Sequence, residues 1–194
     1  MLFITQLLAQ ARRSDPHLRV VHLHDIVRRV WEAVSDRGAA ANVEVRLELA
    51  EGLPPVMGDP EQLQQVLLNL SVNALQAVGP AGRVVLRTRC QPVGLRDPSG
   101  YIEVEVADTG AGIPAHDLPH IFEPFFTTKG VTGGTGLGLT ISREIVRSHH
   151  GEIRVESRLG QETRFIVSLP LAHAVVAQAA GGADAILCQR WEKG

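Results

Sequence analysis

The sequence has 194 residues, 44% of them hydrophobic and only 4% aromatic, which is enough for one domain with a mainly aliphatic core. Its 19 basic and 21 acidic residues give a net charge of −2, which excludes bulk electrostatic attraction to nucleic acid or to an anionic membrane. The two cysteines, Cys90 and Cys188, form no CxxC pair and favour a reducing compartment, and no apolar run is long enough to span a membrane. We therefore expect a soluble, cytoplasmic chain without membrane contact.

The first half of the chain contains three predicted helices and one strand. Residues 1–13 lack Gly and Pro and carry helical spacing of apolar residues. A second helix is predicted over 23–37, and residues 43–49 alternate as a half-buried strand. The third helix begins after Asp59, because Asp59 can cap it and Pro60 suits its first position, and it runs to Val78.

The second half contains four strands and one helix, predicted over 83–91, 101–107, 137–149 (the helix), 153–158 and 163–169. Charged residues occupy one side of these strands and apolar residues the other. One face of the sheet should therefore be wet and the other covered by helices, which is an α+β fold, a two-layer sandwich. Residues 171–194 are rich in Ala and Gly and are expected to form a loose tail.

Two glycine clusters and one acid form the most informative stretch. Asp108 ends a predicted strand with the parity of its apolar face, so it should lean into the packed layer and need a donor. Gly110 and Gly112 follow directly and let the backbone pass close to a ring. A second cluster, 133–138, opens the helix at 137–149. Backbone N–H groups in such loops and at helix N-termini bind anions, so the stretch predicts a phosphate cradle beside an acid that can accept the amino hydrogens of adenine.

Two amides lie one turn apart on the third helix. Asn69 and Asn73 should project from the same side, where Asn73 offers an oxygen to Mg²⁺ and Asn69 supports the metal or a phosphate. Lys129 can add a positive charge near the phosphates, and residues 119–135 can act as a lid. Each feature alone has a plainer interpretation, as solvated helix amides, a surface lysine or a flexible linker. No P-loop motif is present, and the second glycine cluster does not follow a strand as a Rossmann motif would.

Four segments together resemble a known family. Asn69–Ala74 resembles the N box, Asp108–Gly112 the first glycine box, Phe122–Phe126 the F box and Gly134–Leu139 the second glycine box of sensor histidine kinases. These motifs and their order resemble the catalytic and ATP-binding domain of those kinases, within the Bergerat group that also includes gyrase, chaperone and mismatch-repair ATPases. The residues in these motifs are most similar to those of the nitrogen-regulation type of sensor kinase.

The resemblance implies a mixed sheet with one face covered by about three helices, binding of ATP (and of its product ADP) with Mg²⁺, and transfer of the γ-phosphoryl group to a histidine on a dimerisation domain and then to a response-regulator aspartate. It implies Asn69 and Asn73 as catalytic residues and Asn73 as the metal ligand. The nucleotide-binding positions that it implies are Asn69, Asn73, Asp108, Gly110, Gly112, Ile113, Lys129, Gly134, Thr135, Gly136, Leu137, Gly138, Leu139 and Thr163. It also divides the chain into residues 1–15 as the end of a dimerisation-domain helix, 16–170 as the ATP-binding domain and 171–194 as the tail.

Some positions depart from the family pattern. His150 and Glu162 stand where glycines are usual, and neither is expected to touch the chemistry. The phosphoacceptor motif is absent, because His24-Asp25 lacks its proline and lies too near Asn69. The acceptor histidine should therefore lie outside this chain. A metal site at His149-His150 is disfavoured, since adjacent helix positions do not share a face.

Two other functions remain open. A self-contained ATPase of the gyrase or chaperone type would carry a glutamate where this chain has Asn69, and an amide cannot act as a general base at neutral pH. We therefore expect slow ATP hydrolysis. A nucleotide-gated interaction module, or a serine-type protein kinase of the same fold, would use the same nucleotide site without transfer to histidine.

Overall fold

A five-stranded mixed sheet forms one layer of the protein. The computed structural model describes residues 16–91, 100–128 and 135–172. The strand order is β2-β4-β5-β7-β6, with β2 parallel to β4 and every other neighbouring pair antiparallel. Its elements are β1 (Arg19–Val21), α2 (Leu23–Ala40), β2 (Glu44–Glu48), β3 (Val56–Gly58), α3 (Pro60–Ala77), β4 (Arg83–Gln91), β5 (Tyr101–Asp108), α4 (Gly138–Ser148), β6 (Glu152–Arg158) and β7 (Glu162–Pro170).

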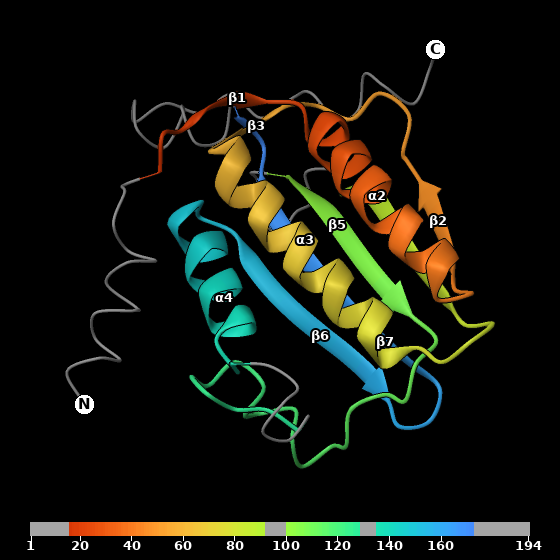
Figure 1. The fold of residues 1–194 in the computed structure, drawn as a ribbon. Helices are drawn as coiled ribbons and strands as arrows, with labels where there is room; N and C mark the ends of the chain where they lie inside the picture. The colour runs from red at the N-terminus through yellow and green to blue at the C-terminus, as the bar shows by residue number, and fades with distance from the viewer. Residues whose placement is uncertain (1–15, 92–99, 129–134, 173–194) are drawn as a thin grey trace.

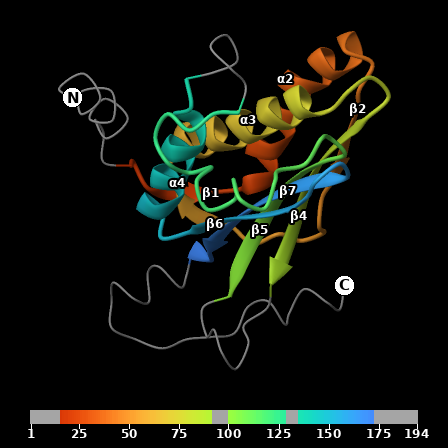
Figure 2. The same ribbon diagram turned by 90° about the horizontal axis from the view of Figure 1, so that it is seen from below.

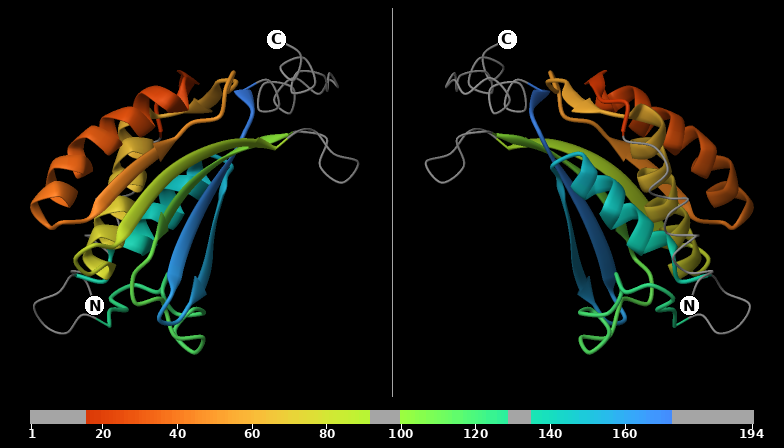
Figure 3. Two further views of the ribbon diagram at one scale, coloured as in Figure 1. Left: turned by 90° about the vertical axis from the view of Figure 1, so that its right-hand side faces the viewer. Right: turned by 90° about the vertical axis from the view of Figure 1, so that its left-hand side faces the viewer.

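Helices α2, α3 and α4 form the second layer, with α3 between the other two (Figure 1). The two side views in Figure 3 show them on one side of the twisted sheet. The core between the layers is almost entirely aliphatic, as the composition predicted, and includes Val27, Leu70, Leu86, Ile102 and Val146. The predicted α+β sandwich is therefore confirmed, and most predicted elements agree with the structure to within about one residue at each end.

The helix α2 continues three residues beyond its predicted end at residue 37. Gly38 lies inside the helix and is buried. A Cβ at this position would stand only 2.4 Å from Cγ2 of Val45 in the neighbouring strand. The glycine therefore permits close packing of helix on strand rather than ending the helix. The indole Nε1–H of Trp31 donates to the carbonyl of Val45 at 3.3 Å and fixes the same contact.

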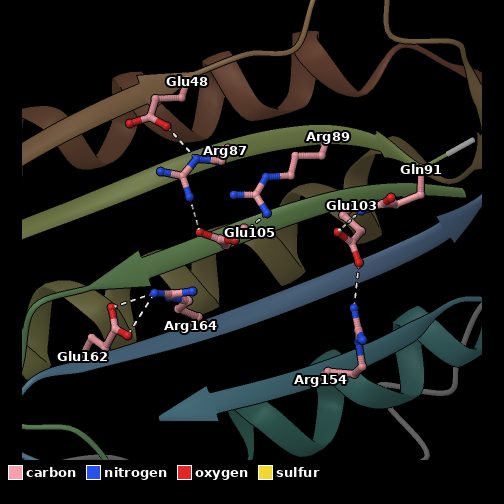
Figure 4. A network of polar contacts seen from close by, with 9 residues as sticks. All are labelled: Glu48, Arg87, Arg89, Gln91, Glu103, Glu105, Arg154, Glu162 and Arg164. Atoms are coloured by element: carbon pink, nitrogen blue, oxygen red, sulfur yellow. Dashed lines mark hydrogen bonds and ion pairs between the residues drawn. The ribbon is translucent and has the colours of Figure 1, made fainter. Parts of the chain in front are cut away.

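The prediction that the sheet face away from the helices is exposed to solvent is wrong for two residues. Glu103 and Glu105 are only 7% and 5% exposed, although they point away from the helices. Figure 4 shows the reason: two arginines lie over them, Arg87 from the adjacent strand β4 to Glu105 and Arg154 from β6, beyond β7, to Glu103, both at 2.6 Å. A buried carboxylate needs donors of this kind. The strand alternation identified the face correctly, but it could not show that arginine side chains cover it.

A small sheet, β1 paired with β3, was not predicted. Both strands have three residues, which is too short for a detectable alternation. Leu171 bridges Val56 of β3 and is fully buried, so the folded part of the chain reaches past residue 170. The predicted helix at 1–13 and almost all of the predicted tail lie outside the described residues.

The segment between β5 and α4 crosses the end of the sheet. Seen from below in Figure 2, its described residues 109–128 lie beside the end of the helical layer where α4 begins. This end of the fold brings together the C-terminus of β5, the C-terminal half of α3, the β6–β7 turn and the N-terminus of α4.

Candidate functional site

A cavity of about 510 Å³ opens at this end of the fold, between α3, α4 and the sheet. Ten of the fourteen residues that the sequence singled out line it: Asn69, Asn73, Asp108, Gly112, Ile113, Thr135, Gly136, Gly138, Leu139 and Thr163. Gly110 and Leu137 are buried beside it without lining it. Lys129 and Gly134 lie outside the described residues. Segments separated by up to about half of the chain therefore meet around one space.

Asp108 ends β5 on the face that the helices cover and is 4% exposed. One carboxylate oxygen, Oδ1, accepts the backbone N–H of Gly110 at 2.9 Å. Burial raises the pKa of Asp108 to about 6; the Gly110 hydrogen bond acts against this rise, and the nearby charge of Glu162 adds to it. The Glu162 carboxylate itself is paired with Arg164 at 2.9 Å, and the expectation that it does not touch the chemistry stays a prediction.

The first glycine turn packs against protein backbone on both sides. A Cβ on Gly110 would stand 2.4 Å from the carbonyl oxygen of Ala77, where α3 ends. Gly112 has φ +69°, and a Cβ there would stand 2.3 Å from the carbonyl oxygen of Arg158 at the end of β6. These two glycines thus hold the turn between α3 and β6, a reason beyond the close approach to a ring that the sequence suggested.

Thr163 and Ile113 are joined by a residue that the sequence analysis missed. The Ile113 N–H donates to Oγ of Ser157 at 2.8 Å, and that oxygen lies 2.9 Å from Oγ1 of Thr163. Thr163 pairs with Asp108 across β5 and β7, and with Ser157 across β6 and β7. The parity of β6, in which Ile153 and Ser157 face the same way, was the available signal for an inward serine.

Helix α3 brings its two amides to the cavity. Asp59 caps the helix by accepting the N–H groups of Glu61 at 3.0 Å and Gln62 at 3.2 Å, as the sequence predicted. The apolar stripe of α3 packs inward, which leaves Asn69 and Asn73 half-buried on the cavity side.

The amide of Asn69 is held by α4. Its Nδ2–H donates to Oγ of Ser142 at 3.0 Å. A side chain at Gly138 would push this amide aside, because a Cβ there would stand 2.4 Å from Oδ1 of Asn69. Ser142, which is 2% exposed, is a second residue that the sequence analysis did not identify.

The N-terminus of α4 faces the cavity through Gly136 and Gly138. The cap residue Leu137 provides no side-chain hydrogen bond to the first turn. The first N–H groups of a helix lack partners inside the helix and carry the positive end of its dipole. This arrangement suits an anionic group such as a phosphate.

The segment containing the three phenylalanines is fixed at both of its ends. The carbonyl of Phe122 accepts from Thr140 Oγ1 and Arg143 Nη2, both at 3.1 Å, and the Arg143 guanidinium lies over its ring at 5.3 Å. Phe125 has φ +67° and donates its N–H to the carbonyl of Gly136 at 3.0 Å. Phe122 packs against the core and Phe126 lines the cavity, whereas Phe125 is 45% exposed. The proposed closing of this segment as a lid stays a prediction.

His149 and His24, which the sequence analysis considered for a metal site and for phosphate acceptance, both make hydrogen bonds within the fold. His149 is fully buried and uses both ring nitrogens: Nδ1 lies 2.7 Å from the carbonyl of Ile145, and Nε2 accepts the N–H of Asp59 at 2.9 Å. His24 on α2 contacts Oγ1 of Thr88 at 3.2 Å, in the opposite part of the fold from α4. Within the described residues no three His, Cys, Asp or Glu side chains cluster as a metal site. No helix among those residues is long and apolar enough to cross a membrane.

Comparison with protein families matches residues 58–173, more than half of the chain, to the family described as histidine kinase-, DNA gyrase B-, and HSP90-like ATPase. Among curated relatives, the sensor kinase CckA of Brucella abortus is 39% identical over 175 residues, covering 86% of this chain and 18% of CckA. The sensory histidine kinase/phosphatase NtrB of Rhodobacter capsulatus is 38% identical over 179 residues, covering 87% of this chain and 49% of NtrB. This chain therefore spans about half or less of these relatives.

Among solved structures, full-length ShkA in complex with AMPPNP superposes with a TM-score of 0.71 at 31% identity, covering 80% of this chain and 31% of that one. The resemblance read from the four sequence motifs is therefore confirmed, and NtrB is among the relatives. The chain belongs to the histidine kinase-, DNA gyrase B- and HSP90-like ATPase family, as an ATP-binding catalytic domain of the sensor histidine kinase type.

Proposed function

We propose that this chain holds ATP with Mg²⁺ in the cavity and presents the γ-phosphoryl group to a histidine on a separate dimerisation domain. One observation carries the proposal: the cavity combines a buried carboxylate, two helix amides and a helix N-terminus within a single space. These are the parts that a purine, a metal ion and a chain of phosphates need. Phosphoryl transfer needs little covalent chemistry from the protein, so positioning and charge stabilisation suffice.

Each part of the cavity has a role in this proposal. Asp108 accepts hydrogens from the adenine amino group, with Thr163 beside it. Asn73 gives its amide oxygen to Mg²⁺, a hard cation that also takes phosphate oxygens and water as ligands. When bound, this ion neutralises phosphate charge. The N-terminus of α4, around Gly136 and Gly138, receives the phosphates, and Lys129 adds a positive charge to the same group.

The chain's own residues favour transfer over hydrolysis. Asn69 stands one turn before Asn73, at the place where a base would activate water, and its Nδ2–H is already bound to Ser142. An amide has no basic oxygen at neutral pH, so water is not activated there. We place the histidine acceptor outside this chain, because His24, the candidate that the sequence offered, contacts Thr88 on β4 instead and His149 is buried in the core. The product histidine phosphate would then serve a response-regulator aspartate.

The test is to incubate the full chain with γ-labelled ATP and a separately supplied dimerisation domain of a relative. We expect acid-labile label on the added histidine and very slow release of phosphate without that domain. Label on a serine, or binding of ATP without any transfer, would instead favour the serine-kinase or interaction-module alternatives. Rapid phosphate release by the chain alone would favour a self-contained ATPase.

Calorimetric titration with ATP, with and without Mg²⁺, tests the metal part separately. Asn73→Ala should remove the gain in affinity that Mg²⁺ provides and leave metal-free binding close to the parent value. A Mg²⁺ gain that persists in Asn73→Ala would remove Asn73 from the metal site.

A further inference from the structure

The polar floor of the cavity is a row of three side chains on neighbouring strands. Asp108 of β5 lies opposite Thr163 of β7, and Thr163 lies opposite Ser157 of β6. Asp108 and Thr163 are 4% and 3% exposed and line the cavity, whereas Ser157 is half-buried behind Thr163 and does not line it. Ser157 can therefore act on a ligand only through Thr163 or through the turn at Ile113.

The hydroxyl of Ser157 makes three hydrogen bonds. It accepts the N–H of Ile113 at 2.8 Å, contacts the carbonyl oxygen of Glu162 at 2.9 Å and contacts Oγ1 of Thr163 at 2.9 Å. A serine hydroxyl has one proton and two lone pairs. The carbonyl of Glu162 can only accept and the Ile113 N–H can only donate. All three bonds form together only if Ser157 donates to Glu162 and accepts from Thr163.

This assignment fixes the hydroxyl proton of Thr163. That proton is directed at Ser157, so only the lone pairs of Thr163 Oγ1 remain for a ligand. The Asp108 carboxylate also offers only acceptors when it is ionised. The floor of the cavity therefore presents acceptors from both residues, and a ligand edge that carries donor hydrogens is favoured over one that carries a carbonyl.

We propose that Ser157 is a positioning residue for base selectivity: by taking the proton of Thr163, it makes the base pocket prefer a 6-amino purine to a 6-oxo purine. The proposal rests on the proposed function, because it assumes that the purine lies against Asp108 and Thr163. Without Ser157, the Thr163 hydroxyl turns freely and can donate to a 6-oxo group as readily as it accepts.

The experiment measures the affinities of ATP and of inosine triphosphate, which carries a 6-oxo group, for four proteins that each contain the whole 194-residue chain. The parent should prefer ATP. Ser157→Ala should reduce the ratio of the two affinities by roughly fivefold to tenfold, the effect of one hydrogen bond. Ser157→Thr keeps a hydroxyl on a β-branched side chain that suits a strand, and it should restore the parent ratio. Thr163→Val removes the oxygen itself and should also reduce the ratio.

Each outcome separates selectivity from simple support of the fold. If Ser157→Ala weakened both nucleotides equally, Ser157 would only hold the turn at Ile113 and the proposal would be overturned. If Ser157→Ala failed to fold, an unchanged ratio in Thr163→Val would overturn it just as well. A parent protein that bound neither nucleotide would instead count against the proposed function.

Discussion

The backbone N–H of Asp59 donates to Nε2 of His149 at 2.9 Å, joining residues that are 90 positions apart in sequence. Asp59 caps the start of α3, and His149 follows the last turn of α4. The other ring nitrogen of His149 bonds to the carbonyl of Ile145 on α4. One imidazole therefore ties together the two helices whose opposite parts line the cavity, and this sets the position of the amides on α3 relative to the N-terminus of α4.

Replacing His149 with alanine should destabilise the protein by roughly 2–4 kcal/mol. The substitution leaves a cavity in the core and removes the hydrogen-bond partner of the Asp59 N–H. Urea unfolding measures the free energy of unfolding directly. His150→Gly is the matched control: His150 is exposed at φ +58°, and its loss should change stability by no more than about 1 kcal/mol. Equal effects of the two substitutions would contradict this role of His149.

His149 should also make stability depend on pH. Burial lowers its pKa below the usual 6.5, with a hydrogen bond to Ile145 and the charge of Asp59 acting against this. The unfolded chain then binds more protons than the folded one as pH falls through about 6.5, so the stability that neutral His149 provides is present above that pH and lost below it.

The comparison of parent with His149→Gln isolates this effect. His24 has a pKa that burial also lowers, and Asp108 acts in the opposite sense, since its raised pKa favours the folded state as pH falls through about 6. We expect the free energy of unfolding to decrease less steeply in His149→Gln than in the parent from about pH 7 to about pH 5. Parallel curves for the two proteins would be inconsistent with a titrating His149.

Most of the fold was predictable because its elements are long and regular. The apolar stripe and the Asp59 cap identified α3, and alternation identified the sheet strands of five or more residues. The short strands β1 and β3 were missed because three residues carry no measurable period, and their pairing is decided by tertiary contacts. The burial of Glu103 could not be predicted either, since it depends on an arginine that lies 51 residues away in sequence.

The candidate site was only partly visible in the sequence for a similar reason. Motifs identify residues that face a ligand, such as Asp108 and Asn73, because their chemistry is distinctive. Ser142 and Ser157 are ordinary serines in sequence, and their importance comes from partners 73 and 44 residues away. Only the folded arrangement shows that each of them orients a residue that lines the cavity.

Nucleotide binding should weaken as pH falls through about 6. Burial raises the pKa of Asp108 to about 6, so this carboxylate becomes protonated there and loses its charge and part of its acceptor capacity. Calorimetry with ATP and with adenosine measures this effect, and adenosine is included because it has no phosphate that titrates in the same range. An adenosine affinity independent of pH between about 7 and about 5 would exclude Asp108 as the acceptor.

A substitution at Glu162 checks that the pH dependence of nucleotide binding comes from Asp108. Glu162 raises the pKa of Asp108, so Glu162→Gln should move the midpoint of the pH dependence below about 6. Glu156→Gln removes the same charge from an exposed position on β6 and should leave the midpoint where it is in the parent. A midpoint that moved equally in both variants would indicate a general effect of net charge.

The first glycine turn should not tolerate a side chain at Gly112. Alanine there meets both an unfavourable φ of +69° and the Arg158 carbonyl at 2.3 Å, so we expect a loss of roughly 2–4 kcal/mol in the free energy of unfolding. Gly160 offers a matched control, because its φ is +74° and nothing lies within 4 Å of a Cβ at that position. Gly160→Ala should cost only about 1 kcal/mol, the cost of the backbone conformation alone. Similar losses at both positions would show that the contact with Arg158 contributes nothing.

Ser142 should matter for phosphoryl transfer more than for stability. It accepts the Nδ2–H of Asn69 at 3.0 Å and so fixes which way this amide faces in the cavity. Ser142→Ala leaves the amide free to turn, and we expect the rate of transfer to an added dimerisation domain to fall roughly tenfold while the free energy of unfolding falls by about 1 kcal/mol. Ser142→Thr keeps the hydroxyl and should recover most of the rate. Ser148→Ala is the control on the same helix, since Ser148 is the last residue of α4 and bonds to the carbonyl of Ile145 rather than to Asn69. If Ser142→Ala transferred phosphate as fast as Ser148→Ala, the orientation of the Asn69 amide would have no part in the reaction.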